Sequence, residues 1–480
     1  MASRDTDQTS TEQVPFGATE RPSKPSEGGD APRRSTRRGG RRRRRRKRGD
    51  DETSKTSEAS SGEEQKREGS ARSSERGKRD DAEGGRRERR TRRRRRGGGG
   101  GGGEGREKAN LGKASGILII EKGNYGTLRD LDRMLIPDKK DVYVSQRLIQ
   151  KHNLRDGSLI EGPIGRGQKH KFQLNSVDSI DGMDPKEVKR TKNFRDLTSI
   201  DPDFHYATGD LTENASMKVV DVIAPIGRGQ RALIVAPPRS GKTTLLREFA
   251  AGIEKGYTDV HLFVLLVDER PEEATDWVRS TKGTVFVSTT DETPKNHVQL
   301  SEAVWMRCQR LVELGEDVVL IIDSLTRLAR AYNNHKGTSG KTMSGGLDSR
   351  AMERPRQIFG SARNTETAGS LTIVGTTLVD TGSRMDQMIF EEFKGTGNME
   401  LVLNRKLADR RIFPAIDIEK SGTRKEEKLF TSQRLRRITT LRRVLLKMNF
   451  IEAMELLVTK LDDVDKIDKF LERFEVDPEA

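Results

Sequence analysis

One eight-residue segment, APPRSGKT at residues 236–243, contains the residue types that bind phosphate. It follows the apolar stretch RALIV and precedes a helical stretch, so the order is strand, loop and helix. In that order, backbone N–H groups and a helix amino end cradle an anion, the lysine reaches the β and γ phosphates, and the hydroxyl holds magnesium. The segment departs from GxxxxGK(S/T) only at Ala236, where glycine is usual, and the prolines beside it favour a rigid loop. We therefore predict a nucleotide site at Lys242 and Thr243 rather than a purely structural Gly-Lys turn.

Two carboxylates end apolar stretches that would lie beside this loop. Asp323 ends VVLIID, where it could order a magnesium-bound water, although an Asp after a strand is often only a helix cap. Glu269 lies in LLVDERPEE, where it could polarise an attacking water. Sequence alone leaves Asp268, Glu272 and Glu273 as competitors, or a surface acidic cluster with no catalytic role.

Two arginines late in the chain could balance the charge of a transferred phosphate, Arg411 in LADRRIFPAI and Arg424 in EKSGTRKEE. A neighbouring subunit could supply such a residue. From position alone, both are better explained as ordinary surface arginines.

The elements that must position these residues follow Met217. Continuous apolar strands, RALIVA, HLFVLLVD, VVLIID and SLTIVGTTLVD, alternate with helical stretches at 243–255 and 295–314. This alternation predicts a parallel sheet covered on both faces. The segment 432–474 has apolar spacings of three and four, which predicts a terminal helical cap or interface.

A smaller module precedes this domain. From Gly116 to Val177, short alternating apolar segments are separated by Gly, Asn and Asp turns, with one helical turn at 145–152. The pattern predicts a small antiparallel barrel of the OB or cold-shock type, whose strand face commonly binds single strands by base stacking. A barrel with a purely structural role fits the pattern equally well.

Two irregular loops, 333–347 and 380–397, carry Gly, Ser, Thr and isolated cations, Lys341 and Arg384. Such loops in a nucleotide-driven ring could grip a polyanion in the pore. Otherwise they are long surface loops.

The charge of the chain is concentrated in its first 110 residues, which carry 33 basic and 20 acidic residues and so supply +13 of the net +16. This tail has one aromatic residue and two arginine blocks, at 41–48 and 92–96, and is predicted to be unstructured. Nucleic acid is the polyanion that arginine suits best, with strongly salt-dependent binding.

The 480 residues contain one cysteine, and neither a signal-peptide pattern nor an apolar run of membrane-spanning length. We expect a soluble, intracellular protein with no membrane partner and no disulfide framework.

The motifs together resemble the Rho family of bacterial transcription termination factors, over roughly residue 116 to the end. The resemblance rests on PIGRGQRALIVAPPRSGKTTLL, LLVDERPEEATD, DSLTRLARAYN, SGKTMSGGLD, ARNTETAGSLTIVGTTLVDTGSRMD, EEFKGTGNMEL and RRIFPAIDIEKSGTRKEE. It implies an RNA-dependent ATPase and helicase with a RecA-like core. Six identical subunits would hold ATP and Mg²⁺ between neighbours, move 5′ to 3′ along nascent single-stranded RNA and release it from RNA polymerase in the bacterial cytoplasm.

The resemblance also implies roles for individual residues. Lys242, Thr243 and Asp323 would serve phosphate and Mg²⁺, the last partly through water, while Glu269 would activate water. Arg424 would act in trans as an arginine finger and Arg411 as a second phosphate sensor. The residues lining the nucleotide would be Gly227, Arg228, Gly229, Gln230, Arg231, Ala232, Arg239, Ser240, Gly241, Lys242, Thr243, Thr244, Arg270 and Phe413, and those binding RNA would be Tyr125, Arg129, Tyr143, Lys169, Lys171, Lys341 and Arg384.

The barrel departs from the family pattern. Thr127 stands where a second aromatic residue is usual, and Lys169 and Lys171 stand where a carboxylate and a tyrosine are common. Losing a stacking ring removes about 1–3 kcal/mol per base, whereas lysines add phosphate attraction without base preference. We therefore expect weaker cytosine selectivity than is typical of the family. A small helical domain usual ahead of the barrel is not visible in the sequence, and the arginine-rich tail occupies its place.

The predicted organisation is a basic tail at 1–110, a barrel at 111–178, a connector at 179–215 and a RecA-like domain with its helical cap at 216–480. Two other functions stay open. One is an RNA-binding or condensate-forming protein whose ATP site is a slow switch, and the other is a rotary ATP synthase subunit with the same core.

Overall fold

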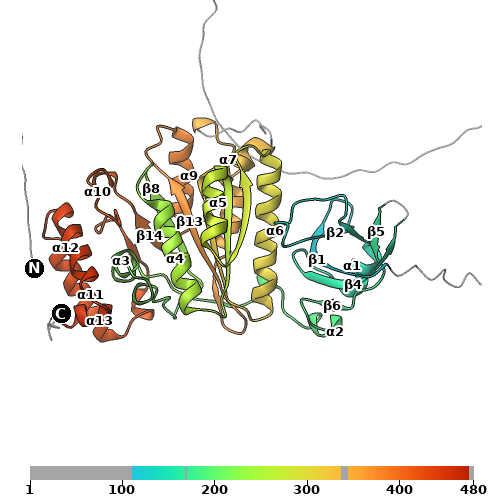
Figure 1. Ribbon diagram of the computed structural model, residues 1–480, viewed down its shortest axis with the longest axis horizontal. Coiled ribbons are helices and arrows are strands. Elements are labelled where there is room, and N and C mark those ends of the chain that lie inside the picture. The colour runs from blue at the N-terminus through green and yellow to red at the C-terminus, as the bar shows by residue number, and fades with distance from the viewer. Residues whose placement is uncertain (1–110, 168–169, 337–343, 475–480) are drawn as a thin grey trace, which may run out of the picture. The chain divides into compact units, whose positions relative to one another are not determined.

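The computed structural model describes residues 111–167, 170–336 and 344–474. The predicted tail at 1–110 and two predicted RNA-binding residues, Lys169 and Lys341, lie outside these ranges. No helix within them is both long and apolar enough to span a bilayer. The described chain contains a β-barrel followed by a larger α/β domain (Figure 1).

The barrel is a six-stranded sheet that closes on itself. Its strands are β1 (Lys113–Ile120), β2 (Gly126–Arg129), β3 (Val142–Val144), β4 (Leu159–Arg166), β5 (Phe172–Leu174) and β6 (Ser179–Ile180). The order is β1-β2-β3-β5-β4-β6, and β1 also pairs with β4, which closes the barrel. Neighbouring strands are antiparallel except β3 and β5, which meet in parallel.

Alternating side chains fill the barrel. Leu118, Val144, Ile160 and Leu174 are fully or almost fully buried in one cluster. Helix α1 (Gln146–His152) begins where the Ser145 hydroxyl accepts from a backbone N–H, as the sequence predicted for 145–152. β6 pairs with β4 and so lies beyond the predicted barrel end at residue 178, because a two-residue strand leaves no alternating pattern to detect.

The connector is held in place by apolar side chains. It contains α2 (Pro185–Val188), η1 (Phe194–Asp196), β7 (Ser199–Ile200) and η2 (Gly209–Leu211). Phe194, Leu197 and Tyr206 are buried. β7 pairs with β12 (Asn364–Thr365), which adds a two-stranded ribbon to the α/β domain. These few isolated apolar residues do not form a periodic pattern, so the sequence indicated only a polar connector.

The α/β domain is built on a seven-stranded sheet, which contains the four predicted parallel strands and three more. Its strands are β8 (Arg231–Ala236), β9 (His261–Glu269), β10 (Thr284–Thr289), β11 (Val318–Asp323), β13 (Leu371–Leu378), β14 (Met399–Val402) and β15 (Gly422–Thr423). The order is β10-β9-β11-β13-β8-β14-β15, and only β14 and β15 are antiparallel. Parallel strands bring their carboxyl ends to one edge, where the site of an open α/β sheet is expected.

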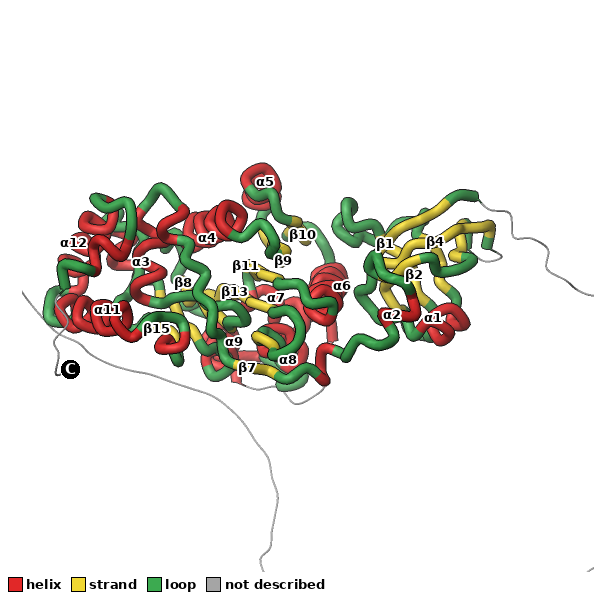
Figure 2. The backbone as a smooth tube through the Cα atoms, turned by 90° about the horizontal axis from the view of Figure 1, so that it is seen from below, coloured by secondary structure: helices red, strands yellow, loops and turns green. Residues whose placement is uncertain are grey.

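Helices cover both faces of this sheet (Figure 2). Successive residues of β8 alternate between the two cores, with Ala232 and Ile234 in one and Leu233 and Val235 in the other. The first core also contains residues of α3 (Ala215–Ile223), α4 (Lys242–Gly256) and α5 (Pro271–Ser280). The second contains residues of α6 (Pro294–Glu313), α7 (Leu325–Lys336), α8 (Glu353–Gly360) and α9 (Arg384–Lys394).

The chain continues into a helical cap, which confirms the helices predicted in 432–474. The cap consists of α11 (Ser432–Leu445), α12 (Phe450–Asp462) and α13 (Ile467–Leu471). Ile438, Leu441 and Met454 join the core that contains α3. The buried Lys218 amine of α3 donates to two backbone carbonyls at the carboxyl end of α12, that of Leu461 in its last turn and that of Val464 beyond it. Three short elements complete the domain: α10 (Arg405–Asp409), η3 (Ser344–Gly346) and η4 (Glu426–Lys428).

Candidate functional site

The phosphate-binding loop connects the carboxyl end of β8 to the amino end of α4. Arg239 and Gly241 have φ values of 63° and 85°, so the loop turns through the left-handed region at these two positions. Ala236 does not have a positive φ. It is fully buried and continues the pairing of β8 with β13. Alanine therefore serves at residue 236, because this backbone does not need the freedom of glycine there.

The loop lysine is paired with a buried carboxylate. Lys242 forms an ion pair with Oδ1 of Asp323, which also accepts from the Thr376 hydroxyl at 2.9 Å. Asp323 is completely buried at the end of β11, and its Oδ2 atom has no hydrogen-bond partner among the described residues. A buried carboxylate oxygen without a partner is unfavourable unless a ligand or water satisfies it.

Mg²⁺ fits this arrangement. The free Asp323 oxygen and the Thr243 hydroxyl are hard oxygen ligands at the loop, of the kind that Mg²⁺ takes directly or through water. In the part of the chain that the structure describes, no group of three or more His, Cys, Asp or Glu side chains could hold a metal by itself. The remaining ligands of such an ion would therefore be phosphate oxygens and water.

Glu269 is the most enclosed of the four acidic residues that the sequence left in competition. It is 2% exposed, whereas Glu272 is exposed and Asp268 and Glu273 are half-buried. Burial raises the pKa of Glu269, as does the nearby negative charge of Asp323. The Arg327 guanidinium of α7, 3.0 Å away, acts in the opposite direction on this pKa. The geometry favours Glu269 as the carboxylate that contacts a water beside the phosphates.

A cavity of about 250 Å³ lies beside the loop and contains several of the predicted nucleotide-binding residues. Phe413 is 43% exposed and lies against Gly241, where a Cβ would come within 3.1 Å of its ring. The cavity is lined by Ser216, Ser240, Gly241, Thr244, Leu245, Glu248, Leu403, Phe413, Pro414 and Ala415. Its shape and aromatic wall suit a nucleobase.

Sequence reasoning missed Glu248 in this cavity. Burial raises the pKa of Glu248, and its Oε2 atom is buried without a hydrogen-bond partner among the described residues. The spacing could have identified it, because Glu248 is four residues after Thr244 and so lies on the same face of α4. Arg239 is at the turn of the loop, and Arg270 is exposed beyond β9, 3.9 Å from Glu273.

The segment predicted to line the nucleotide upstream, 227–232, lies at the amino end of β8 and not at the loop. Arg228 pairs with Asp317 at 2.9 Å, and Gly229 donates to the Thr372 hydroxyl. Gln230 and Arg231 bond to Asn398 and Thr396, respectively. Since β8 has six residues and is about 20 Å long, the structure does not bring residues 227–232 together with the loop of the same subunit.

The two predicted phosphate-sensing arginines are found at opposite ends of β8. Arg411 is exposed and precedes Phe413 by two residues, on the loop side. Arg424 is exposed and directly follows β15. Thr423 of β15 pairs with Met399 of β14, and Met399 pairs in turn with Ala232 near the amino end of β8. Neither side chain has a hydrogen bond or ion pair with any other described residue. Arg424 therefore lies too far from the loop of its own subunit to contact a phosphate there.

Aromatic side chains gather on one face of the barrel. The ring centroids of Tyr125 and Tyr143 are 5.5 Å apart, and His170, which the sequence analysis did not select, lies 4.4 Å from Tyr143. Lys171 is exposed above the Phe172 ring. Arg129 is paired with Glu121 at 3.1 Å and with Asp141 at 4.0 Å. Its side chain is only 5% exposed, so little of it is accessible on this face.

The two predicted pore loops meet near α9. Arg384 begins this helix, is exposed and follows the Ser383 cap. A Cβ on Gly345 of η3 would come within 3.1 Å of the backbone at Met385, so the described end of the first loop contacts the start of the second. Asp386 fixes this region through Arg330 on α7, with Nε 2.9 Å from one carboxylate oxygen.

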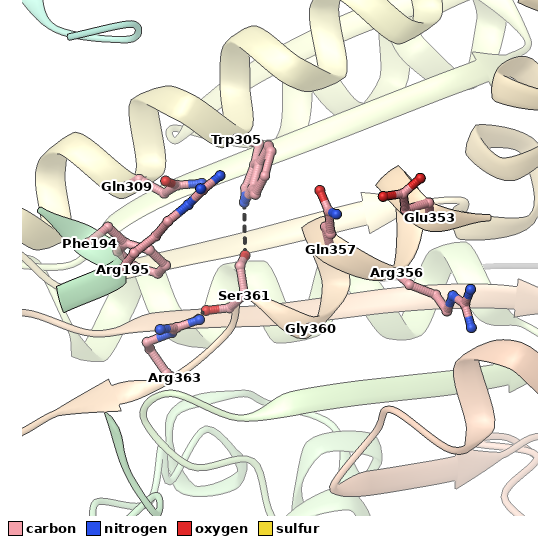
Figure 3. Close-up of a pocket in the computed structure, with 10 residues that line it drawn as sticks. All are labelled: Phe194, Arg195, Trp305, Gln309, Glu353, Arg356, Gln357, Gly360, Ser361 and Arg363. Atoms are coloured by element: carbon pink, nitrogen blue, oxygen red, sulfur yellow. Dashed lines mark hydrogen bonds between the residues drawn. The ribbon is translucent and has the colours of Figure 1, made fainter. Parts of the chain in front are cut away.

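A second cavity, of about 570 Å³, lies elsewhere and contains none of the predicted site residues. It lies between α6, α8 and η1, where Trp305 points toward Ser361 and donates to its hydroxyl at 2.9 Å (Figure 3). Arg363 stacks on the Phe194 ring with its guanidinium carbon 4.5 Å from the centroid. The contact of Arg363 with Phe194 links the connector to the α/β domain.

In comparisons with known proteins, the barrel and the α/β domain match different family profiles. Residues 114–186 match the family profile described as "Rho termination factor, RNA-binding domain". Residues 216–423 match the profile described as "ATP synthase alpha/beta family, nucleotide-binding domain". Among solved structures, the assembled ATPase of the enteropathogenic E. coli type III secretion system aligns with a TM-score of 0.49 and 17% identity, over 75% of this chain and 98% of that chain.

Curated relatives match most of the chain, and all three described here are named Transcription termination factor Rho. The protein from Borreliella burgdorferi is 48% identical over 72% of this chain and 68% of its own length. The Pseudomonas aeruginosa protein is 47% identical, and the Haemophilus influenzae protein is 48% identical, each over 74% of this chain and 86% of its own length. With this identity over this length, the chain belongs to the Rho family of transcription termination factors.

Proposed function

We propose that this protein is an RNA-dependent ATPase that ends transcription, acting as a homohexameric RNA translocase. The observation that carries the proposal is the pairing of two sites in one chain. One is a phosphate-binding loop whose lysine meets a buried aspartate beside the buried Glu269, and the other is a barrel with an aromatic face. The first suits phosphoryl transfer and the second suits unpaired bases.

At the loop, Lys242 and the backbone N–H groups bind the phosphates of ATP, while Thr243 and Asp323 hold Mg²⁺, the latter partly through water. When bound, this ion offsets the negative charge of the phosphates. The base lies against Phe413, and Glu269 accepts a hydrogen bond from the attacking water, which is thereby oriented toward the γ phosphate. Raised pKa values suit general bases, and burial raises that of Glu269.

Ring assembly completes the site. Arg424 acts on the ATP of a neighbouring subunit, since it lies at the opposite end of β8 from its own loop. A positive side chain that arrives from a neighbour stabilises the charge of the transferred phosphate. Arg411, on the loop side, serves as the second sensor. The segment 227–232 at the amino end of β8 would then face the nucleotide held by the neighbour.

RNA contacts two regions. Tyr125, Tyr143, Arg129 and the lysines at 169 and 171 bind nascent single-stranded RNA on the barrel. Lys341 and Arg384 contact it in the pore, and Arg384 does so from the start of α9. The translocating ring acts on RNA polymerase in the bacterial cytoplasm and releases the transcript.

Phosphate release, measured with and without RNA, tests the proposal. We expect ATP hydrolysis to rise at least tenfold with RNA and to be lost in Lys242→Ala. Lys255→Ala is the matched control, since Lys255 is exposed at the far end of the same helix. If hydrolysis is equally fast without RNA, the proposed function is wrong.

The same assay tests base preference. Because Thr127 provides no ring and Lys171 is exposed, stimulation by mixed RNA should approach that by poly(C). Stimulation by poly(C) with none by mixed RNA would contradict this expectation.

A rotary ATP synthase subunit shares the nucleotide-binding profile found at 216–423. The RNA-binding profile at 114–186 favours the RNA function instead. A failure of the full chain to bind single-stranded RNA would reverse this preference.

A further inference from the structure

Three aromatic rings gather on one face of the barrel. Tyr143 lies in β3, Tyr125 directly precedes β2, and His170 lies two residues before β5. The His170 and Tyr143 rings are stacked, with centroids 4.4 Å apart and an interplanar angle of 7°. The Tyr125 ring is tilted to both, 5.5 Å from Tyr143 and 6.4 Å from His170. β2, β3 and β5 are consecutive in the sheet, so the three rings share one surface.

Thr127 leaves space on this surface. It pairs directly with Tyr143 across β2 and β3, and its Oγ1 atom is buried with no hydrogen-bond partner among the described residues. A threonine side chain cannot stack on a base. The space beside it is a cavity of about 330 Å³, and His170 lines the same cavity.

No contact within the barrel explains why the His170 ring lies flat on the tyrosine. His170 is exposed, and its ring nitrogens make no hydrogen bond or ion pair with the part of the chain that the structure describes. One ring face lies on Tyr143, and the side chain as a whole is exposed. An exposed imidazole held flat by a tyrosine can receive a further flat ring.

We propose that His170 is a base-stacking residue of the RNA site and supplies the ring that Thr127 lacks. This inference rests on the proposed function. An unpaired nucleobase stacks on the exposed His170 ring and extends the stacked pair that this ring forms with Tyr143. Stacking on a ring face reads no base edge, so this contact accepts purines and pyrimidines alike.

The test compares His170→Ala, His170→Phe and Lys171→Ala in the full chain, with binding of a fluorescent mixed-sequence oligoribonucleotide measured by anisotropy over a range of salt. Removing the ring should weaken binding about 5- to 150-fold, the range measured when a stacking ring is truncated. The decrease should be the same at every salt concentration, and His170→Phe should bind within a few-fold of the parent. Lys171→Ala removes one phosphate contact instead, so its log K against log salt slope should fall by about 0.7.

Two results would overturn the inference. One is parental affinity in His170→Ala. The other is an equal loss in His170→Ala and His170→Phe with a flatter salt slope, which would assign His170 a charge contact and not a stack. Melting temperatures of the variants identify any loss of fold, which is not expected from an exposed side chain.

A further variant separates this inference from the proposed function. If the parent protein binds RNA and Tyr143→Ala weakens that binding while His170→Ala does not, only the role of His170 is wrong. If the parent itself does not bind RNA, the proposed function fails first.

Discussion

Near the carboxyl ends of β9 and β11, four charged side chains neutralise one another in two ion pairs when no nucleotide is bound. Lys242 pairs with Asp323, and Arg327 pairs with Glu269 at 3.0 Å. The two carboxylates are buried, so the loss of either cation would leave a costly unpaired charge. ATP brings further negative charge into this balanced group. In the proposed mechanism, Lys242 would leave Asp323 for the phosphates, and Mg²⁺ and arginines from outside the group would offset the added charge.

The pH dependence of hydrolysis should report the pKa of Glu269. Its carboxylate must be ionised to accept from water, and burial raises its pKa, so activity should fall as the pH decreases through that raised value. Arg327 lowers this pKa, so Arg327→Gln should raise it further and move the acidic limb of the kcat profile to higher pH. Profiles at saturating ATP and RNA check this.

A control variant and a second substitution complete that test. Arg405→Gln, at an exposed arginine whose acidic partner is Asp409 at 3.7 Å, should leave the acidic limb unchanged. Glu269→Gln should lower kcat about 100-fold or more and abolish the limb. An acidic limb at the same pH in the parent and Arg327→Gln would show that another group titrates.

At the scale of elements, the sequence predicted the helices and strands whose apolar residues recur with a regular period, and it missed the elements without such a period. The predicted strand RALIVA is β8, and the predicted helix at 295–314 agrees with α6 to within one residue. Apolar runs and a helix cap identified both. The two-residue strands β6, β7, β12 and β15 have no period, since each depends on contacts with distant segments.

The site shows the same limit. Lys242 follows one long strand, and Asp323 and Glu269 each end another. Parallel strands bring their carboxyl ends to one edge of the sheet, so the meeting of these three residues could be predicted. His170 and Glu248 could not be selected in the same way. The role of His170 depends on its contact with Tyr143 of another strand, and that of Glu248 depends on Pro414 and Ala415 lining the same cavity.

The turn before β8 depends on one glycine. Gly229 has φ of +84°, and a Cβ there would lie 2.2 Å from the backbone nitrogen of Asn364. Gly229→Ala should therefore lower stability by about 3 kcal/mol or more, because backbone must move to accept it. Thermal unfolding of the full chain measures the change.

Gly182→Ala provides the matched control. Gly182 has φ of +77° with nothing within 4 Å of an added Cβ, so it tests the backbone conformation without the clash. We expect a cost of about 1–2 kcal/mol. Equal melting temperatures for the two variants would mean that the backbone of β12 moves away from the turn at little energetic cost.

At the scale of the whole molecule, charge is distributed unevenly along the chain. Residues 1–110 carry +13 of the net +16. Since phosphate contacts release counterions, a chain that starts at Leu111 should bind RNA more weakly at low salt and with a shallower salt dependence. Anisotropy titrations at several salt concentrations check this. Identical slopes for the two chains would mean that the tail does not contact RNA.

In the proposed ring, each subunit would contribute to two different ATP sites. The loop with Lys242 lies at the carboxyl end of β8, and Arg424 is level with its amino end. A subunit with Lys242→Ala still offers its arginine to a neighbour, and a subunit with Arg424→Ala still offers its loop. Each variant alone should be almost inactive in RNA-stimulated phosphate release.

Mixed rings should regain activity. When the two variants are mixed in equal amounts and reassembled, about one interface in four joins an intact loop to an intact arginine, given a closed ring with identical interfaces. Hydrolysis should then exceed the sum of the separate variants and reach at most about a quarter of the parental rate. Mixing Lys242→Ala with the double variant is the control, since that mixture contains no intact loop. If the first mixture never exceeds the sum of its parts although mixed rings form, Arg424 does not act on the neighbour's ATP.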